Sequence, residues 1–193
     1  YGNSVTFIKG EAEGIRLVDA TQDDGTRIWP DSTDCGRPVD PGTMPGFLKR
    51  VGPQDYPLLD FYSMAQNLVV PERARQVIEE LEPGVHQFFK MQIVEEHDKS
   101  RTPIGERYFV VVCNRLATLH DTLCEPPLEN GWPVGFLKKH VFSRQKIGQA
   151  HLWIDKRAPG AGPAGCLISE ELQERLAAPH MSGIQFTAFQ VAD

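Results

Sequence analysis

The segment HDTLC at positions 120–124 places an imidazole, a carboxylate and a thiol close together in the chain. Cysteine catalysis needs a thiolate that a nearby imidazole activates, with a third group orienting the ring. His120 and Asp121 adjoin Cys124 in sequence, and His86 or His140 could be brought to the thiol by folding. However, Cys124 enters the proline-rich run CEPP at once, which is unlike the strand-to-helix turn that presents a nucleophile. The sequence therefore predicts a protein that is not an enzyme, with a small thiol-dependent enzyme using Cys124 and a histidine as the alternative.

The run GAGPAG at 160–165 has the glycine spacing of a dinucleotide-binding loop. In that motif the last glycine opens a helix, so that the pyrophosphate meets the helix N-terminus. Here the apolar triplet Cys166, Leu167 and Ile168 follows instead, and it is typical of an extended strand. We therefore interpret GAGPAG as a flexible loop that joins two strands.

The histidines and cysteines lack the spacing of a metal site. None of the six histidines is four residues from another, as a helical zinc site requires, and the four cysteines form no Cys-x-x-Cys pair. Cys113 lies inside the apolar run RYFVVVC, where we expect a small buried hydrophobic residue. We predict no metal and no cofactor. The wide cysteine spacing also supports no disulfide framework, so the expected compartment is the reducing cytoplasm.

Acidic residues are concentrated in the first half of the chain. Residues 1–100 hold ten Lys and Arg against seventeen Asp and Glu, a net charge of −7, whereas residues 101–193 hold ten against nine, a net charge of +1. Such a surface repels nucleic acid, which needs a basic footprint, and attracts a basic protein partner. An acidic surface that serves only solubility is the alternative.

No stretch of the sequence is apolar for long enough to span a bilayer, so we expect no membrane insertion. The first ten residues, YGNSVTFIKG, lack the charged start and apolar centre of a signal peptide. Because the chain begins at Tyr1 rather than Met, a trimmed leader stays open.

The pattern of residues 68–94 reappears in residues 166–192. In each copy an apolar triplet leads into a helix, with Pro71 in the first turn of one and Ser169 as a capping residue in the other. Buried-stripe spacing follows, at Ala74, Val77, Ile78 and Leu81 in the first copy and Leu172 and Leu176 in the second. Alternating apolar positions close the units, Phe89, Met91 and Ile93 in one and Thr187, Phe189 and Val191 in the other.

We therefore predict an α+β fold whose mixed sheet is built on a duplicated strand–helix–strand unit. Two unrelated units that share a common pattern are the alternative. The run at 107–113 (RYFVVVC) indicates a central strand, 136–142 and 151–154 indicate further strands, and 95–105 indicates a polar hairpin-like loop.

The N-terminal part differs in composition from the rest of the chain. Short strands are expected at 5–7 and 15–18, and the five prolines and four glycines of residues 36–57 predict an irregular connection. We therefore divide the chain into an irregular N-terminal arm, residues 1–57, and an α+β domain, residues 58–193.

Two features are candidates for partner binding. Glu95, Glu96 and Asp98 form an acidic cluster in the predicted hairpin-like loop, where they could dock on a basic surface. Trp29 and Trp132 each precede a proline in a predicted loop, where an indole often serves as a contact residue. The alternatives are a solvated loop and indoles that cover the edge of the core.

Four segments in order, NLVVPERARQVIEELEPGVHQFFKMQIV, RYFVVVCNRLATLHD, AHLWID and CLISEELQERLAAPHMSGIQF, resemble the eleventh-numbered immunity family of bacterial polymorphic-toxin systems. The likeness covers about residues 58–193, and the chain departs from the family pattern at Pro71 and Cys124, where hydroxyl residues are commoner. This resemblance implies a small cytoplasmic immunity protein, encoded beside a toxin and acting in bacterial competition, that neutralises the toxin by direct binding and has no active site.

A structural module of a secretion or phage particle is a third class that the sequence leaves open, and it would form symmetric oligomers. The sequence does not identify the toxin, its chemistry, the mode of inhibition or the oligomeric state.

Overall fold

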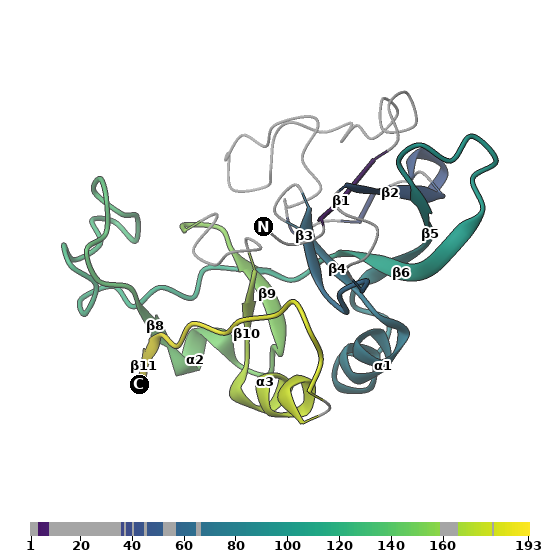
Figure 1. Cartoon of the computed structure of the whole chain (residues 1–193). Helices are drawn as coiled ribbons and strands as arrows, with labels where there is room; N and C mark the ends of the chain where they lie inside the picture. The colour runs from purple at the N-terminus through teal and green to yellow at the C-terminus, as the bar shows by residue number, and fades with distance from the viewer. Residues whose placement is uncertain are drawn as a thin grey trace.

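The computed structural model describes residues 4–7, 36, 38–39, 41–44, 46–51, 57–64, 67–158, 166–178 and 180–193. Within this part, a six-stranded sheet has the strand order β1-β2-β5-β6-β4-β3 (Figure 1). Its strands are β1 (Ser4–Phe7), β2 (Phe47–Val51), β3 (Tyr62–Met64), β4 (Asn67–Val70), β5 (Gln87–Glu95) and β6 (Pro103–Val111). The pair β2 and β5 is parallel and the other neighbours are antiparallel, so the sheet is mixed as predicted.

Strand β6 lies between β5 and β4, which confirms the prediction of a central strand from the run RYFVVVC. Phe109, Val110 and Val111 are all buried, because side chains on both faces of this part of the sheet meet apolar neighbours. The predicted hairpin-like loop is also present, since β5 ends at Glu95 and β6 begins at Pro103.

Two helices cover one face of the six-stranded sheet. Helix α1 (Glu72–Leu81) buries Ala74 and Ile78, and helix α3 (Glu170–Ala177) buries Leu172 and Leu176 in the same core cluster. The helices lie side by side (Figure 1), and an ion pair between Arg175 and Glu80 joins their exposed sides. Both helices occur where the sequence pattern predicts them, and the structure confirms the α+β class.

Smaller sheets complete the described part of the fold. Strands β10 (Leu167–Ile168), β9 (Leu152–Asp155) and β7 (Arg115–Leu116) form a three-stranded sheet, and β8 (Val141–Ser143) pairs in parallel with β11 (Gln190–Ala192). A four-residue helix α2 (Arg144–Ile147) follows β8, and a 3-10 turn η2 occupies Pro41–Thr43. None of the described helices is long and apolar enough to cross a bilayer.

The buried carboxylate of Glu82 connects the first half of the chain to the second half. It accepts hydrogen bonds from the Leu152 N–H in β9 (2.8 Å), from Asn114 Nδ2 (2.6 Å) and from the ring of His86 (2.9 Å). Burial acts to raise the pKa of Glu82, but the hydrogen bonds from His86 and the backbone outweigh it, and the pKa lies below its ordinary value. A charged group is thus kept inside the protein because its acceptor oxygens are paired.

The two predicted repeat units share their order of elements but not their surroundings. Strands β4 and β5 of the first unit belong to one sheet, whereas β10 and β11 of the second belong to two different sheets. Thr187 and Phe189 lie outside β11, so the closing alternation predicted for the second unit is wrong except at Val191. The duplication itself stays a prediction.

Other sequence expectations are corrected in part. The Pro- and Gly-rich segment 36–57 contains β2, whose Leu48 and Arg50 are buried. The short alternating run FLKRV was not recognised as a strand because the prolines and glycines were counted over the whole segment. Of the predicted strand 136–142, only Val141 and Phe142 are in a strand. Residues 5–7 lie in β1 as expected, while 15–18 and the GAGPAG loop lie outside the described residues. The boundary between residues 57 and 58 stays a prediction, although β1 and β2 share the six-stranded sheet with later strands.

Candidate partner-binding sites

The thiol and imidazole of the HDTLC segment have separate structural roles. Cys124 is 1% exposed, and its Sγ donates a hydrogen bond to the Val141 carbonyl (3.4 Å). His120 Nδ1 instead accepts from the Thr122 N–H (3.3 Å). Asp121 pairs with Lys146 (2.8 Å), and this hydrogen bond lowers the pKa of the Asp121 carboxyl. Cys124 therefore packs as a small buried residue, and Asp121 is engaged away from the imidazole.

The other histidine candidates are also engaged elsewhere. His86 is buried between Glu82 and the N–H of Cys113, which donates to His86 Nδ1 (3.1 Å). The ring of His140 meets the ring of Phe189 edge-on, with centroids 6.1 Å apart. Among the described residues, no group of three His, Cys, Asp or Glu side chains could hold a metal ion.

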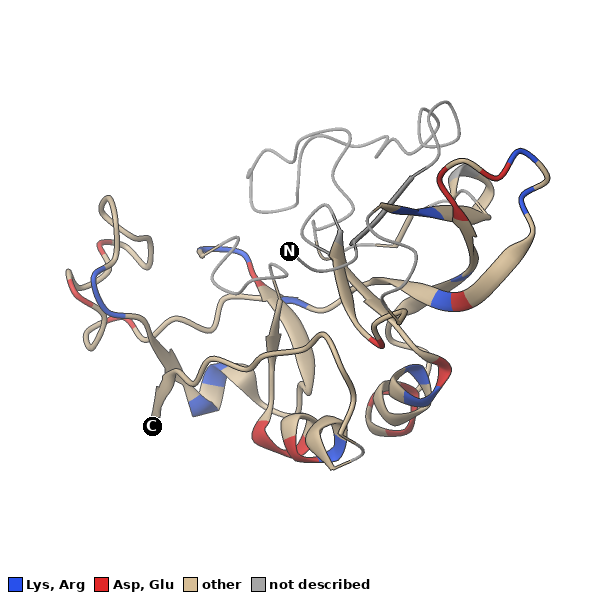
Figure 2. Cartoon of the chain, viewed as in Figure 1, with Lys and Arg blue, Asp and Glu red and all other residues tan. Residues whose placement is uncertain are grey.

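The predicted acidic cluster lies in the turn between β5 and β6, and each carboxylate has an intramolecular partner. Glu95 forms an ion pair with the buried Arg50, and Glu96 pairs with Lys49 (2.9 Å). Asp98 accepts hydrogen bonds from the N–H groups of Ser100 and Thr102, both at 2.8 Å. Figure 2 shows that the turn between β5 and β6 carries both acidic and basic residues. Glu95 and Glu96 are therefore paired with basic side chains, whereas Asp98 keeps hydrogen-bond partners from its own turn.

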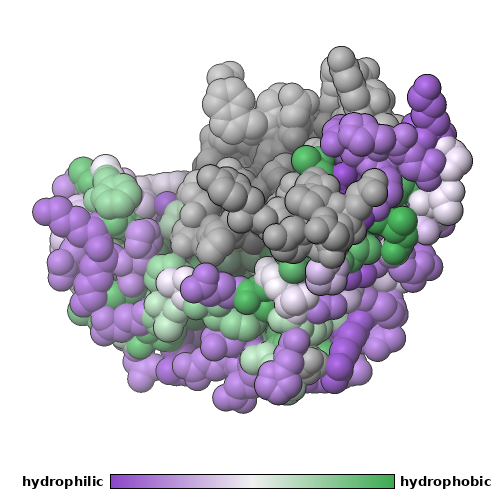
Figure 3. All heavy atoms as spheres, in the orientation of Figure 1, coloured by the Kyte–Doolittle hydropathy of each residue, from purple (hydrophilic) through white to green (hydrophobic). Residues whose placement is uncertain are grey.

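Trp132 lies on an exposed apolar surface, whereas Trp29 lies outside the described residues. Residues 121–138 form a projection from the smaller sheets (Figure 1), which we call the apolar projection. Four of its large hydrophobic side chains are exposed: Phe136 by 87%, Val134 by 49%, Leu123 by 43% and Trp132 by 40%. Hydrophobic atoms are visible at its outer end in Figure 3. Exposed large apolar side chains that occur together in one segment favour a binding role.

Hydrogen bonds and apolar packing hold the base of the apolar projection in place. Backbone hydrogen bonds run from Lys138 N to Glu125 O (2.7 Å) and from Leu128 N to Asp121 O (2.8 Å). Cys124 and Leu137 pack into a core cluster with Leu119 and Phe142. The guanidinium of Arg157 lies 5.9 Å from the centroid of the Trp132 ring, which supports the indole from one side. The exposed side chains are therefore presented by an ordered scaffold.

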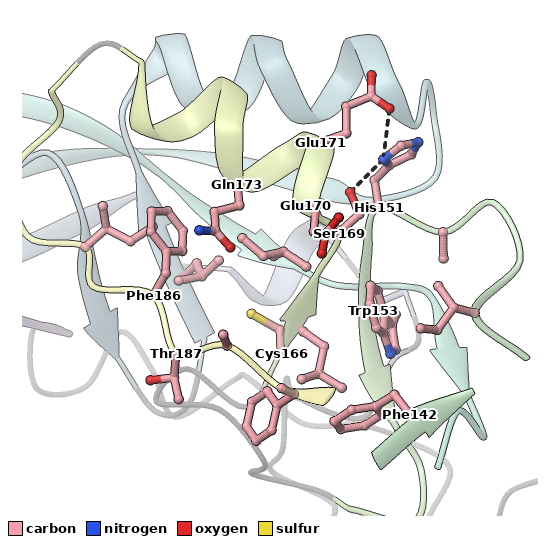
Figure 4. Close-up of a pocket in the computed structure, with 18 of the residues that line it drawn as sticks. Phe142, His151, Trp153, Cys166, Ser169, Glu170, Glu171, Gln173, Phe186 and Thr187 are labelled. Carbon is pink, nitrogen blue, oxygen red and sulfur yellow. Dashed lines mark hydrogen bonds and ion pairs between the residues drawn. The ribbon is translucent and has the colours of Figure 1, made fainter. Parts of the chain in front are cut away.

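A second feature is a cavity of about 460 Å³ between α3, β8, β10 and residues 183–189, which we call the C-terminal strap. Figure 4 shows its walls: Gln173, Glu170 and Ser169 come from the α3 side, Phe186 and Thr187 from the strap, and Trp153 and Phe142 from the opposite side. The volume falls within the range of ligand sites, about 300–1,000 Å³.

The start of α3 sets the charge at this cavity. Ser169 Oγ accepts the N–H of Leu172 (3.1 Å), which confirms the predicted cap, and contacts His151 Nδ1 at 2.8 Å. Glu170 and Glu171 follow in the first turn, and Glu171 lies 4.0 Å from His151. Burial raises the pKa of the Cys166 thiol in the cavity wall to about 12, so that this thiol stays protonated.

Apart from Trp132, neither surface was predicted from the sequence. Val134 follows Trp132 by two positions and Phe136 follows Val134 by two positions, and of these three residues only Phe136 fell within the expected strand at 136–142. They are exposed because residues 121–138 project from the smaller sheets before β8 begins. A local sequence pattern does not reveal such a projection. The cavity joins residues more than 100 positions apart and has no local signal at all.

Residues 22–191 match the model of the immunity protein family (Imm11), which covers most of the chain. The chain therefore belongs to this immunity protein family, as the sequence resemblance implied. Comparison with curated proteins finds no match.

Proposed function

We propose that this protein neutralises a cognate bacterial toxin by direct, stoichiometric binding in the cytoplasm, and that it has no catalytic activity of its own. Membership of the immunity protein family is the observation that carries the proposal. The burial of Cys124 and the ion pairing of Asp121 support a binding role over the rival of a thiol enzyme. We further propose that the toxin is encoded beside this chain.

We assign the toxin-docking surface to the apolar projection, with Phe136 and Trp132 as anchors. A stable complex needs an interface of about 800 Å² on each partner and a few well-placed aromatic anchors. Phe136 is almost fully exposed on a segment whose base is held by backbone hydrogen bonds, so its side chain can be buried by a partner without a large rearrangement.

The acidic cluster has a secondary role in this proposal. Glu96 and Asp98 are held by intramolecular partners, so they can steer a basic toxin during encounter but do not anchor it. Of the seventeen acidic residues in the first 100 positions, nine lie outside the described residues. Trp29 lies outside them too and keeps its place as a proposed contact.

The test uses the toxic C-terminal domain of the large protein encoded in the neighbouring reading frame. The two proteins should form a 1:1 complex by calorimetry, and co-expression should rescue cells from the toxin. Phe136→Ser should weaken binding by more than about 2 kcal/mol, because an anchor side chain is truncated.

Val134→Ser and Val85→Ser provide a matched pair, since both remove an exposed valine and only Val134 lies on the projection. The first should weaken the complex and the second should not. Equal affinities for all three variants would move the docking surface elsewhere, and the absence of any complex would reject the function. Loss of protection in a folded Cys124→Ala variant that still binds the toxin would favour the enzymatic rival.

A further inference from the structure

We propose that the cavity beneath the C-terminal strap receives an extended basic segment of the toxin, which pairs its backbone with the strap and places a Lys or Arg side chain at Glu170. This inference rests on the proposed function, because the toxin supplies the occupant. It adds a second contact of different chemistry to the apolar projection.

The strap offers a line of backbone groups that are held in place but unused. From Ile184 to Ala188, the chain forms no hydrogen bond with any described residue. Its two ends are fixed. Ser182 bonds Asp60 through its N–H (2.7 Å) and accepts the N–H of Phe61 (3.0 Å), and β11 pairs with β8 at the other end. An incoming extended segment gains main-chain hydrogen bonds at such an edge without first ordering it.

The floor of the cavity is apolar and aromatic. Phe142 and Phe189 meet edge-on with ring centroids 5.4 Å apart, and Trp153, Cys166 and Phe186 line the remaining wall. Alternate side chains of an extended segment point to the same face, so one set can fill this floor while the backbone lies against the strap. A compact small molecule would leave the backbone groups of the strap unpaired, which is why the observations favour a peptide segment.

The charge at the start of α3 selects a cation. The exposed Glu170 lines the cavity and has neither an ion pair nor a hydrogen bond with any described residue. Glu171 has only the 4.0 Å contact with His151. Arg144, also in the lining, faces Asp193 at 3.4 Å. Glu170 thus remains available for an ammonium or guanidinium group of the partner.

Hydrogen–deuterium exchange of the full chain tests the backbone contact. In the free protein the amides of residues 185–188 should exchange quickly, because they are not hydrogen-bonded. In the complex with the toxin domain they should slow by at least about tenfold. A complex that forms without protecting these amides overturns the inference while leaving the proposed function intact. Failure to form any complex rejects the proposed function, and the inference with it.

Glu170→Lys and Glu174→Lys form a matched pair for the charge contact. Both residues are exposed on α3 and both changes add two positive charges, but only Glu170 lines the cavity. Glu170→Lys should weaken toxin binding by about tenfold or more, because it places a like charge against the basic segment. Glu174→Lys should leave binding within about twofold of the parent. Equal losses in the two variants, at unchanged melting temperature, would show that only overall charge matters.

Discussion

The first strand–helix–strand unit ends inside a sheet, whereas the second ends at an open surface. Strand β5 has nine residues, buries Met91 and Ile93 and is paired on both sides, by β2 and β6. Strand β11 has three residues, leaves Val191 exposed and pairs only with β8. Strand–helix–strand order is therefore a local property of the sequence. The length and burial of the last strand in each unit depend on which strands are available to pair with its two edges.

This difference separates scaffold from site. The first unit contributes β4 and β5 to the six-stranded sheet, and Glu96 of the polar turn that follows it pairs with Lys49 of β2. The second unit leaves a strap with unpaired backbone groups beside a cavity and an unpaired carboxylate. Where the second unit fails to complete the predicted strand, it provides the second contact surface that we propose for the toxin.

The largest expected effect tests whether the two helices are equally structural. Ile78→Asp in α1 and Leu172→Asp in α3 should each cost more than about 3 kcal/mol, because both place an unpaired carboxylate in the same core cluster. Urea denaturation measures this. Arg73→Asp, exposed on α1, is the control and should stay within about 0.5 kcal/mol of the parent. If Leu172→Asp kept its stability, the second unit would be peripheral to the core.

An intermediate effect concerns Glu82, which links the first and second halves of the chain. Glu82→Gln should cost about 1–3 kcal/mol at pH 7, because the neutral amide cannot accept all three hydrogen bonds of the carboxylate. Since the folded pKa of Glu82 lies below 4.5, its ionised form stabilises the fold above that pH, and the contribution is lost as pH falls further. The difference from the parent should therefore shrink below pH 4.5. A constant difference between pH 7 and 3 would contradict a charged Glu82.

The smallest expected effect concerns helix starts. Ser169→Ala should lower the free energy of unfolding by about 1 kcal/mol, because α3 loses its capping oxygen. Ser169→Thr keeps that oxygen and should recover most of the loss. The N-cap residue of helix α1 is Pro71, which provides no side-chain cap, so this helix has no equivalent contribution to lose. Thermal unfolding of the two Ser169 variants would show whether this difference between the units is energetic as well as geometric.

The sequence predicted elements better than their partners. Both helices follow from apolar spacing around Ile78 and Leu172, and the central place of β6 follows from its continuous apolar run. The path of Thr187 and Phe189 did not follow, because a strand pattern does not say whether a neighbouring edge is available. The apolar projection and the cavity depend on contacts between distant segments, for which one sequence carries no signal. Glu95 was identified as exposed acid, but its pairing with Arg50 required the fold.

The contact between Ser182 and Asp60 also has a consequence for synthesis. It closes a stretch of 122 positions, and Gly183, with φ of 83°, lies so close to the Phe61 carbonyl that any side chain would collide there. Ile184 and Phe186 pack on the core cluster that contains Val70 and Ile78. That core cannot be completed on the ribosome until residues 182–186 have emerged. A nascent chain thus gains its native core, and with it the strap, only after almost the whole of this sequence has been translated.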